Sequence, residues 1–282
     1  MRNHFGTSLR TEIAQGKIVP FIGVYDTFSA TLAGQYYDSI FISGFSFAAS
    51  YYGLPDIGLI SWSDLVALTQ RVRSVLPHHH LLVDIDDGYG DTEIACHVVA
   101  LLEAIGVSGI IIEDQKRPRR CGHVDGKQLL ELDQYLEKIE KILKTRKDLC
   151  VIARTDADEE AEIIRRGEAI VSLGVDAFLA DGLADLNILQ RLKAELKIPL
   201  VFNQLVGGKS PACTLADLQA MGVSIVNYST PCLFAAQGAI EQAMLTLKQQ
   251  DGLPNQKSVS LKDCNTVLHN NLSRRHQTTD HF

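Results

Sequence analysis

The sequence predicts an α/β protein of the (β/α)8 TIM-barrel class, and three observations favour this class. Eight short apolar runs rich in β-branched residues recur along the chain, stretches with helical spacing lie between them, and several of these stretches end in glycine just before the next run. Glycine after a helix is a typical stop signal. No GxGxxG pattern follows the first run, so an open doubly wound sheet is less well supported.

The predicted elements alternate in order along the chain. The apolar residues Leu81-Leu82-Val83 and Ile110-Ile111-Ile112 mark the clearest strands, and each run ends in carboxylates. The predicted strands cover residues 19–26, 39–43, 80–86, 109–114, 149–156, 177–181, 199–204 and 224–229, and the clearest helices cover 63–76, 91–105, 129–144, 159–173 and 185–196. Eight such units suffice to close a barrel.

One large domain fits the length and composition of the chain. Its 282 residues are 46% hydrophobic, and no compositional break appears before the last thirty or so residues. We expect the catalytic barrel over residues 1–250. Residues 251–282 form a polar C-terminal tail, for which we expect a short helix at 261–272 followed by disorder.

Charge and cysteine usage exclude several classes of protein. Lys and Arg number 27 against 34 Asp and Glu, a net charge of -7, and the one basic block is Arg274-Arg275-His276, which argues against nucleic-acid binding. Residues 1–16 lack the apolar core of a secretory signal, and no run approaches membrane-spanning length, so we expect a cytoplasmic protein. Six scattered cysteines without a CxxC pair indicate reduced thiols rather than a zinc site or disulfides.

Polar residues follow every predicted strand, at the end of a barrel where active sites lie. A single Asp or Ser at a strand end can equally cap the next helix, and an Asn can close a turn. Eight strands ending in this way favour a shared site. These residues are Tyr25, Asp26, Ser43, Gly44, Asp84, Asp86, Glu113, Arg154, Asp156, Asp181, Asn203, Gln204, Tyr228 and Ser229.

Two motifs indicate the chemistry. Asp84, Asp86 and Glu113 supply carboxylates at strand ends, which suit a hard cation. Downstream, Cys121 lies between two arginines and His123 and is followed by Gly122, which indicates a mobile polar loop. The charged flanks should favour the thiolate form of this cysteine, and the thiol could transfer a proton.

The ordered motifs resemble the isocitrate lyase and phosphoenolpyruvate mutase superfamily, and within it the short 2-methylisocitrate lyase-like branch. The resemblance spans residues 19 to about 250. It is carried by Val24-Tyr25-Asp26, Ile42-Ser43-Gly44, Gly53-Leu54-Pro55-Asp56-Ile57-Gly58, Asp84-Ile85-Asp86, Ile112-Glu113-Asp114-Gln115, Arg120-Cys121-Gly122-His123, Ile152-Ala153-Arg154-Thr155-Asp156 and Gly208-Lys209-Ser210-Pro211.

The resemblance implies a role for each motif. Asp84 would bind Mg²⁺ or Mn²⁺ directly, with Asp86 and Glu113 acting partly through water and Asp56 beyond them. The loop would close over the substrate, and Cys121 would protonate the product carbanion. The implied catalytic residues are Arg119, Cys121, His123 and Arg154, and the implied substrate-binding residues are Tyr25, Ser43, Gly44, Asp56, Gly122, Asp181 and Asn203.

Several positions depart from the lyase pattern. Phe41 stands where the lyases usually have tyrosine and Arg119 where they have lysine, and neither is a proton acceptor at neutral pH. Ile111 replaces a histidine, and Asp181 a glutamate. After Asn203 the chain continues Gln204-Leu205-Val206-Gly207 instead of a Met-Thr-Glu-like segment that binds distal carboxylates, so a smaller substrate is expected.

The resemblance thus implies a Mg²⁺-dependent carbon–carbon lyase acting on a small 2-hydroxy or 2-oxo di- or tricarboxylate and releasing pyruvate or a related oxo acid. Three alternatives stay open: an oxaloacetate-type decarboxylase, a phosphonopyruvate or phosphoenolpyruvate mutase or hydrolase, and a non-catalytic oxo-acid-binding protein. Members commonly exchange a C-terminal helix between paired subunits and form dimers of dimers, so a homo-oligomer with a swapped helix is also implied.

Overall fold

The computed structural model describes residues 4–255 and 258–279 and contains, within these ranges, a closed barrel of eight parallel strands in sequence order. The predicted barrel is confirmed. The strands are β1 (Val19–Val24), β2 (Ser39–Ile42), β3 (His80–Asp84), β4 (Gly109–Glu113), β5 (Cys150–Thr155), β6 (Ala177–Ala180), β7 (Leu200–Asn203) and β8 (Val223–Tyr228). Pairing of β1 with β8 closes the barrel, so no edge strand remains in this part of the chain.

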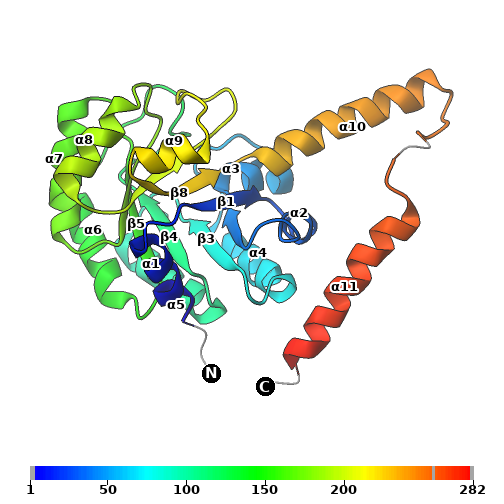
Figure 1. Ribbon diagram of the computed structural model, residues 1–282, viewed down its shortest axis with the longest axis horizontal. Coiled ribbons are helices and arrows are strands. Elements are labelled where there is room, and N and C mark those ends of the chain that lie inside the picture. Colours follow the sequence, from blue (N-terminus) through cyan, green and yellow to red (C-terminus); the bar gives the residue numbers. More distant parts are fainter. Residues whose placement is uncertain (1–3, 256–257, 280–282) are drawn as a thin grey trace.

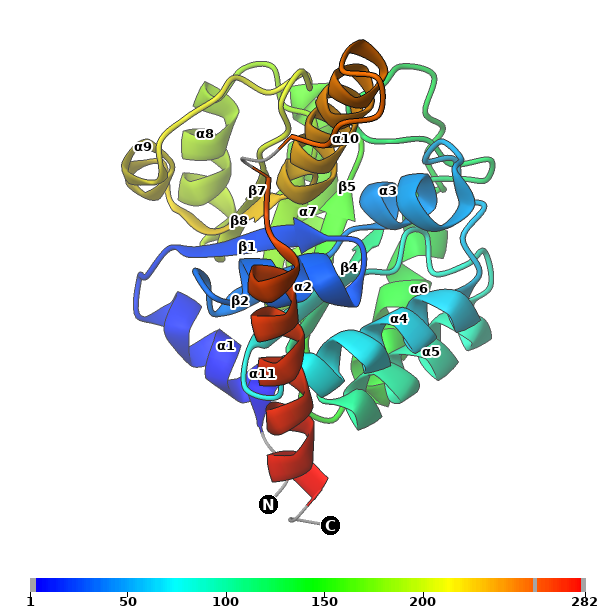
Figure 2. The ribbon, with the colours of Figure 1, turned by 90° about the vertical axis from the view of Figure 1, so that its right-hand side faces the viewer.

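Helices surround the barrel (Figures 1 and 2). They are α1 (Phe5–Ala14), α2 (Thr27–Ala33), α3 (Gly44–Phe47), the π-helix η1 (Ala48–Tyr52), α4 (Trp62–Val75), α5 (Thr92–Ile105), α6 (Leu132–Thr145), α7 (Glu160–Ser172), α8 (Asn187–Leu196), α9 (Leu215–Ala220), α10 (Pro231–Gln249) and α11 (Leu261–Thr279). The five predicted helices are present as α4 to α8. The short α3 and η1 follow β2 and carry the chain toward Asp56.

At least one apolar side chain from each strand fills the barrel interior, and one layer takes a single residue from every strand. These residues are Phe21, Phe41, Leu82, Ile111, Ile152, Leu179, Val201 and Ile225, and Leu9 and Ile13 of α1 pack against the same cluster. Side chains alternate between the two faces of a strand, so the residue two positions later also faces the interior, nearer the C-terminal end. Those residues are Gly23, Ser43, Asp84, Glu113, Arg154, Asp181, Asn203 and Asn227.

Some strand-end residues cap helices, as the alternative interpretation of each position allowed. Asp26 accepts a hydrogen bond from the Ser29 amide at 2.6 Å and begins α2. The Ser43 hydroxyl accepts from the Ser46 amide at 3.2 Å and begins α3. The hydroxyl of Ser43 therefore has a structural partner of its own beside the barrel mouth.

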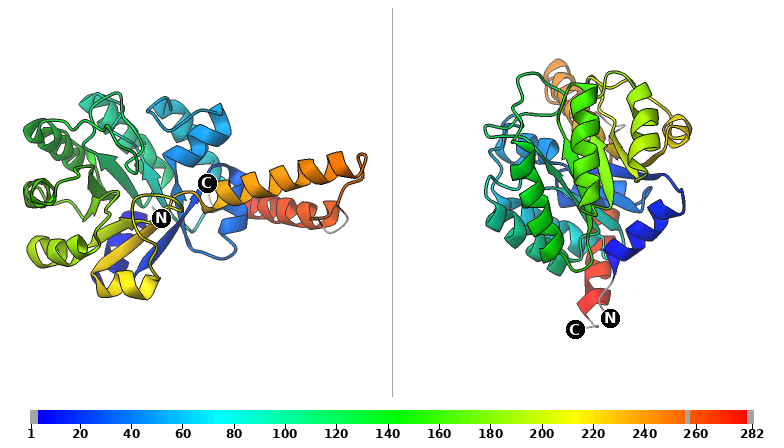
Figure 3. Two further views of the ribbon diagram at one scale, coloured as in Figure 1. Left: turned by 90° about the horizontal axis from the view of Figure 1, so that it is seen from above. Right: turned by 90° about the vertical axis from the view of Figure 1, so that its left-hand side faces the viewer.

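The C-terminal segment leaves the barrel as two long helices (Figures 1 and 3). Helix α10 projects outward with no buried residue, and α11 returns beside α2 and α4, where Asn271 donates to the hydroxyl of Thr31 at 2.8 Å. The expectation of a short helix was wrong, because α11 continues to Thr279. Ser260 and Asp263 hydrogen-bond to each other's amides at its start, and no glycine or proline stops it. Residues 280–282 lie outside the described part.

Among the helices in residues 4–255 and 258–279, none has the length and apolar character that crossing a bilayer requires.

Tyr135 of α6 joins two strands below the polar layer. Its buried hydroxyl lies 2.8 Å from the carbonyl oxygen of Ile112 in β4 and 3.1 Å from that of Arg154 in β5. We predict that Tyr135→Phe lowers the free energy of unfolding by about 1–2 kcal/mol, because two buried carbonyls lose a shared donor. Urea unfolding measures this. Tyr36→Phe is the matched control, since Tyr36 is 81% exposed; equal stability of the two variants would contradict the prediction.

Candidate active site

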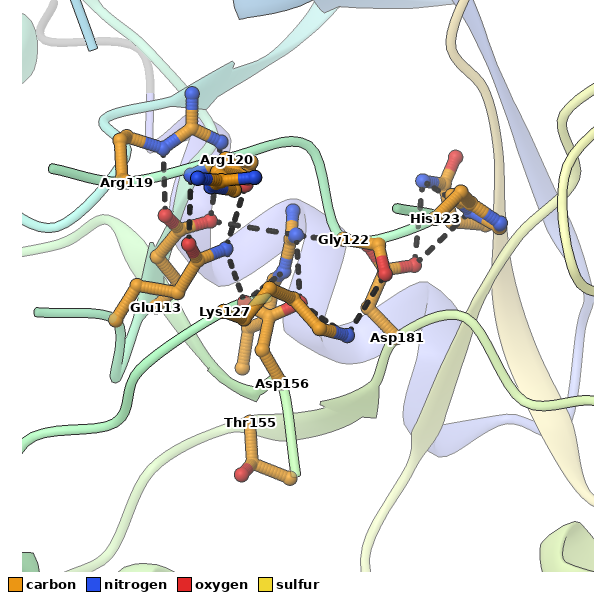
Figure 4. Close-up of polar contacts among 12 residues, drawn as sticks. Glu113, Arg119, Arg120, Gly122, His123, Lys127, Thr155, Asp156 and Asp181 are labelled. Atoms are coloured by element: carbon orange, nitrogen blue, oxygen red, sulfur yellow. Dashed lines mark hydrogen bonds and ion pairs between the residues drawn. The ribbon is translucent and has the colours of Figure 1, made fainter. Parts of the chain in front are cut away.

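The inward-facing polar residues gather at the C-terminal mouth of the barrel. Asp84, Glu113, Arg154, Asp181 and Asn203 come from or directly follow five successive strands, β3 to β7. Figure 4 shows two of these side chains, Glu113 and Asp181, with their polar contacts. The sequence predicted each of them, and their meeting follows from the closure of the barrel.

Arg154 is the central cation of the site. Its Nη2 atom lies 2.8 Å from Asp181 Oδ2, 2.9 Å from Asp156 Oδ1 and 3.3 Å from Glu113 Oε2. Burial lowers the pKa of Arg154, but the surrounding carboxylates raise it by more than burial lowers it. The pKa therefore lies well above its usual value. Arg154 therefore stays charged and keeps three acidic groups together.

Asp84 and Asp86 form an acidic pair beside Gly44. A β-carbon on Gly44 would lie 3.2 Å from Asp86 Oδ1 and 3.6 Å from Asp84 Oδ2, so both oxygens face the same small space. Burial raises the pKa of both carboxyls, that of Asp86 to about 8. Asp86 Oδ1 is buried without a hydrogen-bond partner. A nearby positive charge would favour the ionised pair.

This pair fits a hard divalent cation. Its donors are carboxylate oxygens, which Mg²⁺ and Mn²⁺ prefer, and the Oδ1 atom of Asp86 is an acceptor without a hydrogen bond. Glu113 is more fully engaged, because Arg119 donates hydrogen bonds to both of its oxygens, from Nε at 2.6 Å and from Nη2 at 3.3 Å, whereas Asp86 Oδ1 has only an ion pair with Arg119. Within the described ranges no three His, Cys, Asp or Glu side chains are grouped as metal ligands. Asp84 and Asp86 are therefore the candidate ligands.

Arg119 lies deep in the site instead of on the loop surface. It is 1% exposed, and besides Glu113 it pairs with Asp56 and lies 3.3 Å from Asp86 Oδ1. Figure 4 shows its guanidinium facing Glu113. Asp56 is thereby brought to the site by Arg119, although it comes from the loop after η1.

The loop of residues 115–127 is packed down onto the site. A β-carbon on Gly122 would lie 2.2 Å from Asp181 Oδ2 and 2.4 Å from Arg154 Nη2, so only glycine permits this approach. The Lys127 amine donates to the Gly122 carbonyl at 2.8 Å. The side-chain amide of Gln115 holds the same loop, donating to the Arg120 carbonyl at 2.7 Å.

His123 joins the loop to β6 and to the segment after β7. Its Nδ1 accepts from the Lys209 amide at 3.1 Å, which assigns the proton to Nε2. Nε2 lies 3.4 Å from Asp181 Oδ1 (Figure 4). Burial alone would raise the pKa of Asp181, but Arg154 and His123 lower it more strongly. Asp181 is thus an ionised anchor for both the loop and Arg154.

Cys121 is a protonated thiol, which corrects the expectation of a thiolate. Burial raises its pKa to about 11 and outweighs the hydrogen bond from the His123 backbone, which lowers it. The charged flanks do not reverse this, because Arg119 turns inward to Asp56 and Glu113. A thiol that keeps its proton at neutral pH suits a proton donor.

Some residues match the sequence interpretation less closely. Tyr25 lies half-buried after β1, where its amide and that of Asp26 donate to the Ser29 hydroxyl, each at 3.2 Å.

Lys127 and Asn227 were not among the predicted site residues. The position of Asn227, two residues after the interior Ile225, could have indicated it. The contacts of Lys127 depend on how the loop folds, and no local pattern gives that.

Comparison with known proteins places this chain in a family. Residues 9–248 match the family model described as phosphoenolpyruvate phosphomutase. The chain is 32% identical over 246 residues to 2-methylisocitrate lyase of Bacillus subtilis (strain 168), covering 84% of this chain and 80% of the relative.

Three solved structures share the fold over almost the whole chain. A crystal structure of 2,3-dimethylmalate lyase superposes with a TM-score of 0.91 at 28% identity, covering 98% of this chain and 95% of the other. Oxaloacetate acetylhydrolase with the inhibitor 3,3-difluorooxalacetate gives 0.90 at 27% identity, covering 98% and 96%. Phosphonopyruvate hydrolase in complex with oxalate and Mg²⁺ gives 0.84 at 28% identity, covering 96% of each chain.

We predict that alkylation of Cys121 follows its raised pKa. Only the thiolate reacts, so the rate should rise about tenfold per pH unit from pH 7 to 9.5 without levelling off. Iodoacetamide labelling of the peptide, followed by mass spectrometry, measures the rate. The same peptide in urea-unfolded protein is the control and should level off near pH 8.5. A plateau below pH 8 in the folded protein would show that the thiolate is favoured after all.

Proposed function

Because this chain belongs to the phosphoenolpyruvate mutase and isocitrate lyase superfamily, we propose that it is a Mg²⁺- or Mn²⁺-dependent carbon–carbon lyase. Its substrate would be a small 2-hydroxy or 2-oxo di- or tricarboxylate of the kind cleaved by 2-methylisocitrate lyase. The observation that carries the proposal is the loop of Cys121, which reaches Arg154 and Asp181 through Gly122 and half-buries a thiol whose pKa burial raises to about 11. A cleavage reaction needs such a proton donor.

The metal half of the site would stabilise negative charge on oxygen. Asp84 and Asp86 would hold the ion, which would chelate the substrate and stabilise the oxyanion that forms at the carbon bearing oxygen. The Gly44 amide and the Ser43 hydroxyl would hold the substrate carboxylate, next to the acidic pair. Arg154, fixed by Glu113, Asp156 and Asp181, would add a second positive contact.

The loop half of the site would complete the reaction. In the cleavage of a 2-hydroxy acid, the hydroxyl proton would pass to one of the carboxylates at the barrel mouth, and the oxygen would form the new carbonyl as the carbon–carbon bond breaks. The electron pair of that bond would stay on the departing carbon, which would then take the proton of the Cys121 thiol. His123 is a positioning residue, since its ring joins Asp181 on one side and the Lys209 amide on the other. Phe41 lies in the apolar interior below the site and does not accept the hydroxyl proton.

A second candidate is decarboxylation or hydrolysis of oxaloacetate or a similarly short acid. The side chain of Gln204 turns to its own loop, where it accepts from the Cys213 amide at 2.9 Å. Lys209 is likewise engaged, at 2.7 Å from Asp125 and 3.6 Å from Asp158. These two residues are therefore not disposed to bind a distal carboxylate. This favours a short substrate, in keeping with the likeness to oxaloacetate acetylhydrolase.

We predict Mg²⁺-dependent release of an oxo acid from at least one member of a panel of 2-methylisocitrate, isocitrate, 2,3-dimethylmalate, citramalate, oxaloacetate and phosphonopyruvate. Coupled dehydrogenases measure the product. Asp84→Ala should abolish turnover, because a direct ligand is lost, and Cys121→Ser should lower cleavage about 10²–10⁴-fold with little change in binding.

Each other result names a different function. Turnover of oxaloacetate alone would favour the second candidate, and turnover of phosphonopyruvate alone would favour a phosphonate mutase or hydrolase. Metal and oxo-acid binding without turnover would favour a non-catalytic binding protein. A fully active Asp84→Ala variant would contradict the proposed metal site, and a fully active Cys121→Ser variant would contradict the proposed proton donor.

We also propose that α10 and α11 mediate assembly, as a swapped pair in a dimer of dimers. Helix α10 has no buried residue and exposes Ile240, Met244 and Leu245. Such an apolar face is costly to leave in water and is typical of an interface.

We predict that the full chain is a homotetramer. Truncation after Gln250 should reduce the number of subunits in the assembly, because the truncated chain lacks α11. Light scattering coupled to size exclusion measures the mass, with circular dichroism as the control for folding. A monomeric full chain, or a truncated chain of unchanged assembly state, would contradict the exchange.

A further inference from the structure

The buried guanidinium of Arg119 lies among three carboxylates from different parts of the barrel mouth. Its Nε lies 2.6 Å from Glu113 Oε1, its Nη1 lies 3.3 Å from Asp86 Oδ1, and Nη1 also pairs with Asp56. All four side chains are at most 8% exposed. Buried carboxylates that lie this close repel one another unless a cation is present. The guanidinium is that cation in this structure.

The pocket is shaped for the arginine. Gly58 lies against its aliphatic part, and a β-carbon there would be 2.8 Å from Arg119 Cγ. Gly58 also has a φ of +77°, which glycine adopts readily. The planar guanidinium reaches several acceptors at once and stays charged at any relevant pH. Burial lowers the pKa of Arg119, but Asp86, Glu113 and Asp56 raise it well above the usual value.

The pocket of Arg119 and the proposed metal position share an atom. Asp86 Oδ1, which pairs with Arg119 Nη1, is also the oxygen that faces the space beside Gly44 together with Asp84 Oδ2. A divalent cation bound by this pair would lie close to the guanidinium and repel it. Arg119 also belongs to the loop of residues 115–127, so its displacement would loosen the packing of that loop.

We propose that Arg119 is a built-in competitor of the divalent cation, which lowers metal affinity in the substrate-free enzyme and couples metal binding to release of the loop of residues 115–127. This proposal rests on the metal site of the proposed function. The coupling is reciprocal by thermodynamic linkage. Metal binding weakens the interaction of Arg119 with the acidic cluster by the same free energy by which Arg119 weakens metal binding.

Mn²⁺ binding to the substrate-free full chain tests the competition, with free Mn²⁺ measured by electron paramagnetic resonance. Arg119→Gln should bind Mn²⁺ about tenfold more tightly than the parent, because the competing charge is gone. The matched control is Arg117→Gln, which removes the same charge from the same loop. Arg117 pairs with Asp87, at 2.8 Å from Nε to Oδ2, and not with the acidic cluster around Arg119.

The outcomes separate this proposal from the proposed function. Equal gains in Arg119→Gln and Arg117→Gln, or an unchanged or weaker affinity in Arg119→Gln, would leave the metal site standing and overturn the competition. No Mn²⁺ binding in either the parent or Arg119→Gln would overturn the metal site and the competition with it. If Arg119→Gln does not fold, Arg119→Lys decides. Lysine keeps the charge but loses the two hydrogen bonds of the guanidinium to Glu113, so the metal should displace it more easily. A gain in Mn²⁺ affinity of less than tenfold supports the competition, and an unchanged or weaker affinity overturns it.

A second measurement reads the loop directly. Hydrogen exchange of residues 115–127 should rise when Mn²⁺ is added to the parent, because Arg119 leaves its carboxylates, and should respond much less in Arg119→Gln. Mn²⁺ that slows exchange in the parent would show that the metal and Arg119 cooperate, which would overturn the proposal.

Discussion

The balance of buried charge at the barrel mouth is the constraint on which the site depends. Asp84, Asp86, Glu113, Asp156 and Asp181 are largely buried, and such a concentration of carboxylates is unstable without cations inside it. Arg154 enters this group from β5 and Arg119 from the loop. Because the two guanidiniums meet at Glu113, which lies 2.6 Å from one and 3.3 Å from the other, the barrel and the loop belong to one electrostatic unit.

The same balance explains why the loop can lie so close to the strands. Backbone near charged groups must have partners, and here Lys127 and Gln115 supply them to the Gly122 and Arg120 carbonyls. Gly122 has no side chain to keep it away from Asp181 and Arg154. The close packing also partly removes Cys121 from water, which raises the pKa of its thiol. The position of the loop and the raised pKa of its cysteine therefore have the same physical cause.

The family contains proteins named as lyases, hydrolases and phosphomutases on this fold, so the barrel alone does not specify a reaction. The acidic pair beside Gly44 and the cation Arg154 are compatible with any reaction that stabilises an oxo-acid enolate. The site of this chain combines a half-buried thiol, an arginine within the acidic cluster and an aspartate at position 181. Chemistry at such a site is decided by the groups that deliver or withhold protons.

The sequence by itself determined the order of the eight strands, the five helices α4 to α8 and most of the polar residues that face the barrel mouth. Periodicity and strand-end chemistry are local, so Asp84, Glu113, Arg154 and Asp181 could be identified from their neighbours in the chain. Only the tertiary structure decided that Arg119 turns inward to Asp56, Asp86 and Glu113, that Cys121 keeps its proton, and that Lys127 holds Gly122. Each of these depends on burial and on charges that are distant in sequence, and neither is encoded in a local pattern. The length of α11 depended on local signals that are weak, whereas the position of α10 depends on packing, which hydrophobic spacing does not specify.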